Sequence, residues 1–178
     1  MQSSRLSFHD SETFSIFFTH TKLIIFRYIY GLHGGPLEEV EDLTSESYSR
    51  AWMRRMQFSG DEQDALRWLF TIARHLVIDA YRKKKNHLND TLEILDDKNL
   101  EAIFLSPELS PEDQVARREQ FAHLWELLLG LQFDRREMLV LRYILGWQVK
   151  QISEFFNMEE NTVSVYIHRS LEQIRRNW

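Results

Sequence analysis

The chain has 178 residues, of which 43% are hydrophobic and 13% aromatic, so it can bury one or two modest cores and is too apolar to be disordered. It has no cysteine, which excludes disulfides and thiolate zinc sites, and its formal net charge is −5. Only 6 glycines and 3 prolines occur, and apolar spacings near 3.6 residues dominate, which predicts an all-α protein.

The sequence does not begin with a basic stretch followed by an apolar run, so it predicts no signal peptide. Its most apolar segment, residues 14–30, is interrupted by His20, Lys22 and Arg27 and is not expected to span a bilayer. We therefore expect a cytoplasmic protein that makes no membrane contact.

Three helices are predicted in the first half, over about residues 10–30, 37–56 and 64–85. The Gly34-Gly35-Pro36 break separates the first two, and a loop at Ser59-Gly60-Asp61 separates the last two. Along the second helix, one stripe is expected to face the core: Val40, Leu43, Ser47, Ala51 and Trp52.

The third predicted helix interleaves aromatic residues with cations. Aromatic rings stack on bases and cations meet phosphates, so this pattern favours single-stranded nucleic acid binding. The alternative is a core face with one or two of the aromatic rings in it, and a solvated basic helix end. The aromatic residues are Trp68, Phe70 and Tyr81; the basic ones are Arg67, Arg74, His75, Arg82, Lys83, Lys84 and Lys85; the expected core positions are Leu69, Ile72, Ala73, Leu76 and Ala80.

Metal and catalytic sites are not predicted. His75 and Asp79 are four residues apart, as are Glu119 and His123, but neither pair has a further ligand nearby in sequence. Glycine-rich phosphate loops and nucleophile motifs are also missing from the sequence. We expect no cofactor, no metal and no catalytic residue.

The negative charge is concentrated in the middle of the chain. Residues 1–85 carry a net charge of +1, residues 86–115 one of −7, and residues 116–178 one of +1. Two Ser-Pro steps in the acidic stretch also interrupt helices. We predict two small helical domains, over residues 1–88 and 116–178, joined by an acidic linker over residues 89–115.

The last part of the chain has the pattern of a helix-turn-helix. A short helix is predicted over residues 148–156, a turn at Asn157-Met158-Glu159, and a longer helix over residues 160–176. Asn157 tolerates a left-handed conformation, and the small Ser153 lets the two helices cross closely. The polar outer face of the second helix suits a DNA major groove, although a hairpin inside an ordinary helical core is the alternative.

With these blocks in this order, the chain resembles the bacterial extracytoplasmic-function (group IV) sigma factors. Residues 40–52 look like the polymerase-binding helix of that family, and residues 68–82 look like its promoter-melting helix. The block from Leu139 to Arg169 resembles its DNA-binding domain. The resemblance leaves out the first dozen residues and the linker.

The resemblance implies a promoter-specificity subunit without catalytic activity. Its partners would be core RNA polymerase (the β′ clamp helices and the β flap), promoter DNA, and an anti-sigma factor or another recruiting protein. The residues from 58 to 63 would help to flip a base out of the melted strand, and the linker would thread a basic polymerase channel. The site residues carried over are Asp42, Leu43, Glu46 and Arg50 for polymerase; Arg67, Trp68, Arg74, His75, Asp79, Arg82, Lys83 and Lys84 for the single strand; and Asn161, Thr162, Ser164, Val165 and Arg169 for duplex DNA.

Several positions depart from the family pattern. Ser45 stands where the family usually has Gln, and Glu159 and Asn161 stand where it has Ser and Gly. Residues 164–166 replace a Lys-Ser-Arg run, which removes two cations, and the Glu159-Glu160 pair adds charge that DNA repels. We therefore expect the C-terminal domain to bind free DNA weakly.

Two other functions are compatible with parts of the sequence. A stand-alone helix-turn-helix regulator would bind duplex DNA by itself, usually as a dimer on a palindrome, and would not join polymerase. A protein-interaction module would carry the basic helix without using it for nucleic acid. Association with core polymerase separates the first alternative from a sigma factor, and promoter-specific transcription separates the second.

Overall fold

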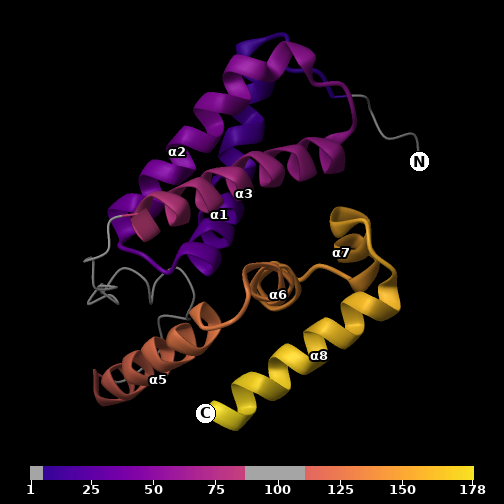
Figure 1. Ribbon diagram of the computed structural model, residues 1–178. Coiled ribbons are helices and arrows are strands. Elements are labelled where there is room, and N and C mark those ends of the chain that lie inside the picture. Colours follow the sequence, from indigo (N-terminus) through magenta and orange to yellow (C-terminus); the bar gives the residue numbers. More distant parts are fainter. Residues whose placement is uncertain (1–5, 87–110) are drawn as a thin grey trace. The chain divides into compact units, whose positions relative to one another are not determined.

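The structure is a computed structural model that describes residues 6–86 and 111–178 (Figure 1). Apart from one isolated β-bridge between Leu6 and Gly60, the regular secondary structure in these two ranges is entirely helical, which confirms the predicted fold class. Contacts divide the chain into two compact units, residues 1–29 with 38–92, and residues 30–37 with 93–178. Most of the predicted linker lies outside the described residues.

The first unit is built from three long helices, α1 (Ser11–His33), α2 (Leu37–Arg54) and α3 (Glu62–Asn86), which lie side by side in Figure 1. A 3₁₀ turn, Arg55–Gln57, extends α2. The three predicted helices are confirmed, with their ends shifted by about one turn or less. The last residues of α1 group with the second unit.

Aspartate side chains determine where two of these helices begin. Asp10 Oδ1 accepts a hydrogen bond from the Thr13 N–H at 2.6 Å, and this bond, with a second from the Thr13 hydroxyl, lowers the pKa of the Asp10 carboxyl. At α3 the Asp64 N–H donates to Asp61 Oδ1 at 2.9 Å, and the Asp61 N–H donates back to Asp64 Oδ2 at 3.1 Å. Both arrangements satisfy N–H groups that a helix start leaves unpaired.

The second unit contains the helix-turn-helix. Its elements are α5 (Pro111–Leu129), α6 (Phe133–Leu139), a π-helix (Val140–Ile144), α7 (Val149–Phe156) and α8 (Glu160–Asn177). Helices α6 and α7 pack on α8, and α5 contacts both α6 and α8. Helix α5 begins at Pro111, a favoured residue at a first helical position, so the last five residues of the predicted linker are helical.

The α7–α8 turn has the predicted left-handed residue. Asn157 has φ 52° and ψ 50°, the Met158 N–H donates to the Ser153 carbonyl at 2.9 Å, and the Asn157 N–H donates to the Glu154 carbonyl at 3.4 Å. These two bonds form a Schellman motif. Ser153 is buried beside Ile152, as expected for the residue at the helix crossing, and the helix-turn-helix prediction is confirmed.

Replacing Asn157 tests the importance of the left-handed turn. Asn157→Val should lower the free energy of unfolding by about 1–2 kcal/mol, because a β-branched side chain strains a left-handed residue. Asn157→Gly, which adopts this conformation freely, is the matched control and should be no less stable than the native chain. Urea unfolding of the full chain, followed by circular dichroism, measures both; equal stability of the Val variant would contradict the prediction.

Candidate functional site

A groove of about 510 Å³ runs between α2 and α3. All four residues predicted to bind polymerase line its α2 side, so they share one surface. The α3 side contributes both apolar and charged residues. The lining residues are Asp42, Leu43, Glu46 and Arg50 from α2, and Leu76, Asp79, Ala80, Arg82 and Lys83 from α3.

The groove combines an apolar floor with a balanced rim of charge. Leu76 is buried, Leu43 and Ala80 are half-buried, and the charged lining residues are three acids and three bases. Such a surface excludes water at its centre while its charges select the partner's orientation, as in protein–protein interfaces. The chemistry of the groove is that of a docking surface for a partner that carries both signs of charge.

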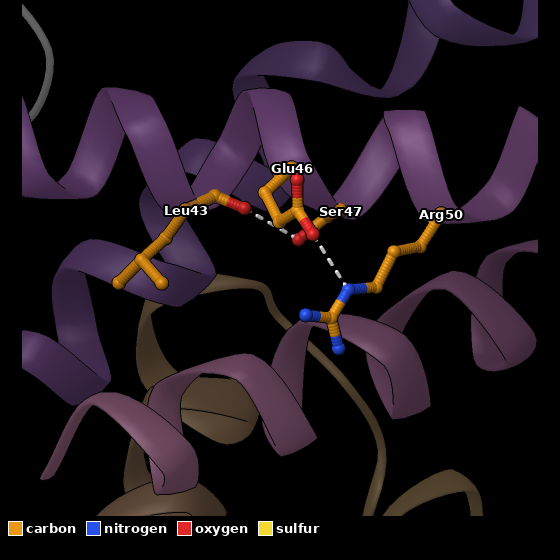
Figure 2. Close-up of polar contacts among 4 residues, drawn as sticks. All are labelled: Leu43, Glu46, Ser47 and Arg50. Carbon is orange, nitrogen blue, oxygen red and sulfur yellow. Dashed lines mark hydrogen bonds and ion pairs between the residues drawn. The ribbon is translucent and has the colours of Figure 1, made fainter. Parts of the chain in front are cut away.

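Figure 2 shows how α2 arranges its groove residues. The Arg50 Nε donates to Glu46 Oε1 at 2.7 Å, one helical turn away, and the two side chains are 37% and 46% exposed. A pair this exposed contributes little stability. It does orient the guanidinium. Among the described residues we find no further partner for the Arg50 terminal nitrogens, which can therefore donate to a ligand.

On the opposite, buried face of α2, hydroxyl side chains bond to the helix backbone. Ser47 Oγ donates to the Leu43 carbonyl and Thr44 Oγ1 to the Val40 carbonyl, both at 2.7 Å. Bonds of this kind let polar residues occupy a core stripe. Of the five residues predicted to face the core, Val40, Ser47 and Ala51 are buried, while Leu43 and Trp52 are only half-buried.

Tyr48 is a core residue that the apolar pattern missed. Its hydroxyl lies 2.8 Å from Thr21 Oγ1, which itself donates to the Phe17 carbonyl at 2.6 Å. Burial raises the pKa of the Tyr48 phenol, so the group stays neutral and donates to Thr21. This contact ties α2 to α1.

The residues predicted for single-strand binding differ in how far they are exposed on α3. His75, Asp79, Arg82 and Lys83 are exposed, and the side chain of Lys84 lies outside the described part of the chain. Arg67, Trp68 and Arg74 are half-buried. Asp79 and Arg82 approach to 3.6 Å across one helical turn, so the carboxylate offsets part of the positive charge.

The aromatic residues of α3 divide between core and surface. Phe70 is fully buried and its ring contacts Tyr28 at 4.7 Å, so it is a core residue. Trp68 stacks on Phe58 with the ring centroids 5.2 Å apart and also meets Phe8 at 6.4 Å. Of the predicted base-stacking pattern, Trp68 and the half-buried Tyr81 remain at the surface.

The predicted base-flipping loop before α3 contacts a segment that the sequence patterns did not single out. The Leu6 N–H donates to the Gly60 carbonyl at 2.7 Å, and Phe8 is fully buried against Phe58. A lone Phe outside any periodic run gives no sequence signal for such a contact. Leu6 and Phe8 therefore belong with the loop although no motif includes them.

The predicted DNA-reading residues share the outer half of α8. Asn161, Ser164, Val165 and Arg169 are exposed and Thr162 is half-buried, whereas Val163, Ile167 and Ser170 are buried on the opposite side. The Arg135 guanidinium of α6 lies 5.1 Å from the centre of the Tyr166 ring, a cation–π distance. At the start of α8, Glu159 and Glu160 are both exposed.

Residues 6–86 and 111–178 contain no group of three or more His, Cys, Asp or Glu side chains that could hold a metal. Among the same residues, no helix is long and apolar enough to cross a membrane.

Two protein families match parts of the chain. The family described as Sigma-70 region 2 matches residues 17–87, and Sigma-70, region 4 matches residues 122–174. The first match contains the α2–α3 groove, and the second contains the helix-turn-helix.

Curated relatives are named as ECF RNA polymerase sigma factors. SigW of Bacillus subtilis (strain 168) is 30% identical over 144 residues, which cover 80% of this chain and 76% of SigW. BldN of Streptomyces coelicolor is 29% identical over 168 residues, or 94% of this chain, and the aligned part spans 61% of BldN.

Two solved structures share the fold. The sigma factor RpoE of Bartonella quintana, in complex with the anti-sigma factor NepR, has a TM-score of 0.66 at 16% identity, and the match covers 93% of this chain and 96% of that one. CnrH, in complex with the cytosolic domain of CnrY, has a TM-score of 0.64 at 18% identity, covering 94% and 88%.

The buried Tyr48 hydroxyl can be tested by removing it. Tyr48→Phe should lower the free energy of unfolding by about 1 kcal/mol, because it removes a buried hydrogen bond to Thr21. Tyr143→Phe is the control: Tyr143 is 59% exposed, and its variant should unfold like the native chain. Thermal or urea unfolding of the full chain measures both variants. Equal effects would contradict a stabilising role of the Tyr48 hydroxyl.

Proposed function

The chain belongs to the extracytoplasmic-function sigma factors of bacterial RNA polymerase, and from this premise we propose how its two units divide promoter recognition. The first unit binds core polymerase and captures one strand of the melted upstream element. The second reads a more distant element as duplex. As a transcription initiation factor the protein carries no catalytic activity of its own.

The α2–α3 groove is the proposed polymerase contact. A coiled-coil helix of the β′ clamp would lay an apolar stripe against Leu43 while its charged flanks meet Asp42, Glu46 and Arg50. Helix-in-groove binding of this kind uses a few apolar anchors and a polar rim. The observation that carries the proposal is the gathering of all four α2 candidates on one groove with a partly buried leucine among them.

Single-strand capture is proposed for the outer face of α3 and the loop before it. Exposed His75 would meet a backbone phosphate, as would Arg82 and Lys83 at the α3 edge of the groove, and Arg67, Arg74 and Lys84 would add to this positive surface. The exposed part of the Trp68 ring would stack on a base. The exposed Asp79 carboxylate would accept a hydrogen bond from a base edge.

Duplex recognition is proposed for α8. Asn161, Thr162 and Ser164 would donate and accept at base edges, and Val165 would contact a thymine methyl group. Arg169 would bind a phosphate or a guanine. With one cation among these five residues, affinity for DNA would depend on polymerase, with the β flap holding the second unit.

We expect the protein in the cytoplasm, where polymerase and DNA are. The acidic linker would thread the polymerase channel. An anti-sigma factor would compete for the polymerase contact, whereas a recruiting protein would support it. That RpoE and CnrH were each solved with a partner protein motivates this last expectation.

The deciding experiment is a pull-down of the full chain with purified core polymerase, followed by mapping of transcript starts after overexpression. Stable one-to-one association and a shared promoter element upstream of the starts are expected. A chain that ignores polymerase but binds a palindromic duplex as a dimer would instead be a stand-alone regulator.

A charge reversal in the groove tests the polymerase contact. Asp42→Arg should weaken association with core polymerase by at least about tenfold, because it reverses the sign of one groove charge in a desolvated contact. Glu41→Arg is the matched control, since Glu41 is the exposed neighbour of Asp42 but does not line the groove. The measurement is fluorescence anisotropy of the labelled full chain; equal losses would place the contact elsewhere.

Neutralising the acids at the start of α8 tests the duplex contact. The double variant Glu159→Gln, Glu160→Gln should tighten binding of the reconstituted holoenzyme to its mapped promoter, because it removes two charges that repel phosphate. Gel-shift titrations at several salt concentrations measure the effect, and Glu154→Gln on α7 serves as the control. Unchanged affinity in the double variant would remove α8 from the DNA contact.

A further inference from the structure

Residues 6–8, which precede α1, fold against the loop that joins α2 to α3. The Leu6 N–H donates to the Gly60 carbonyl at 2.7 Å and forms the β-bridge between these two segments. We call residues 6–8 the arm and residues 58–61 the capture loop. The bridge joins segments more than fifty residues apart in sequence, so it restrains the loop in a way that local structure does not.

Phe8 anchors the arm beneath the capture loop. It is 0% exposed, and its ring lies 5.3 Å from Phe58, 5.0 Å from Phe17 and 5.3 Å from Phe14. Phe58 in turn stacks on Trp68, the aromatic residue proposed to meet a base. The arm therefore supports, through Phe58, the ring proposed for base stacking.

The capture loop is also held at its other end. The reciprocal Asp61–Asp64 bonds cap α3, and a Cβ atom at Gly60 would come within 2.7 Å of Asp64 Cβ and 3.1 Å of the Phe58 ring. The loop is thus packed tightly between the helix start and Phe58, with the arm bonded to its one glycine. Ser59 is exposed between these restraints and free to face a ligand.

We propose that Leu6 and Phe8 are positioning residues for promoter opening. They hold the capture loop in the shape that receives a base from the melted strand, although they do not touch DNA themselves. The role rests on the function proposed above for this loop. Prior ordering matters physically, because a loop that is already fixed loses less conformational entropy when a base binds.

Hydrogen exchange of the free full chain tests the first half of this inference. Phe8→Ala should speed exchange of the amides of residues 58–65 by at least about tenfold, since local opening becomes easier when a buried ring is removed. Leu6→Pro, which removes the N–H donor along with the leucine side chain, should speed them by about two- to tenfold. Phe8→Leu, which keeps a large apolar side chain, should retain most of the native protection against exchange.

Promoter discrimination tests the second half. The readout is the rate of open-complex formation by holoenzyme on the mapped promoter, divided by the rate on the same promoter with one base of its upstream element substituted. The native ratio should be about ten or more, and Phe8→Ala and Gly60→Ala should each lower it by at least about threefold. Ile25→Ala, a fully buried residue further along α1, should destabilise the fold and leave the ratio unchanged.

Three results would overturn the proposed role of the arm. Unchanged exchange in Phe8→Ala and Leu6→Pro overturns the inference, and so does faster exchange with an unchanged ratio. An equal fall of the ratio in Ile25→Ala shows a general stability effect and also overturns it. If the native chain binds no polymerase or does not discriminate between the two promoters, the proposed function is wrong. The exchange data still show, in that case, whether the arm holds the capture loop.

Discussion

Burial of the inner face of α2 is the packing constraint on which the first unit depends. Val40, Ser47 and Ala51 are fully buried there, and Tyr48 reaches Thr21 on α1. Small side chains and internally bonded hydroxyls let α2 approach its neighbours closely. The outer side of the same helix then contributes Asp42, Leu43, Glu46 and Arg50 to the groove without disturbing the core.

The overall charge of −5 gives a misleading impression of the chain's partners. Cations are exposed along α3, acids mark the start of α8, and the groove carries both signs in equal number. A protein that must meet a protein and a nucleic acid on adjacent surfaces benefits from such local patterning, since electrostatic complementarity acts over short distances in salt.

Local patterns were sufficient to predict most of the helical fold. Apolar spacing located α1, α2 and α3, and Asn157 identified the α7–α8 turn because few residues adopt a left-handed conformation. The four α2 candidates came from the family resemblance, and the structure lines them up along one groove. The burial of Tyr48 and Phe8 could not be predicted, because each depends on a partner distant in sequence and neither lies on the expected apolar stripe.

The same limit explains the aromatic residues of α3. Composition alone treats Trp68 and Phe70 alike, whereas the helix turns Phe70 into the core and leaves part of Trp68 outside. Phe70 packs against Tyr28 in the core, whereas Trp68 packs against Phe58 and Phe8 and stays half-buried. The position of a candidate residue on a regular helix face was thus predictable, and the residues that pack behind it were not.

The two acids that open α8 have a consequence for the order of assembly. A genome offers about 10⁶–10⁹ competing non-specific sites, and a protein with a strongly basic reading helix spends most of its time on them. Glu159 and Glu160 lie at the start of α8, and Arg169 is the one cation among its five predicted reading residues, so we expect this domain to bind non-specific DNA weakly. If so, the chain would meet polymerase first, and the holoenzyme would carry out the search for a promoter.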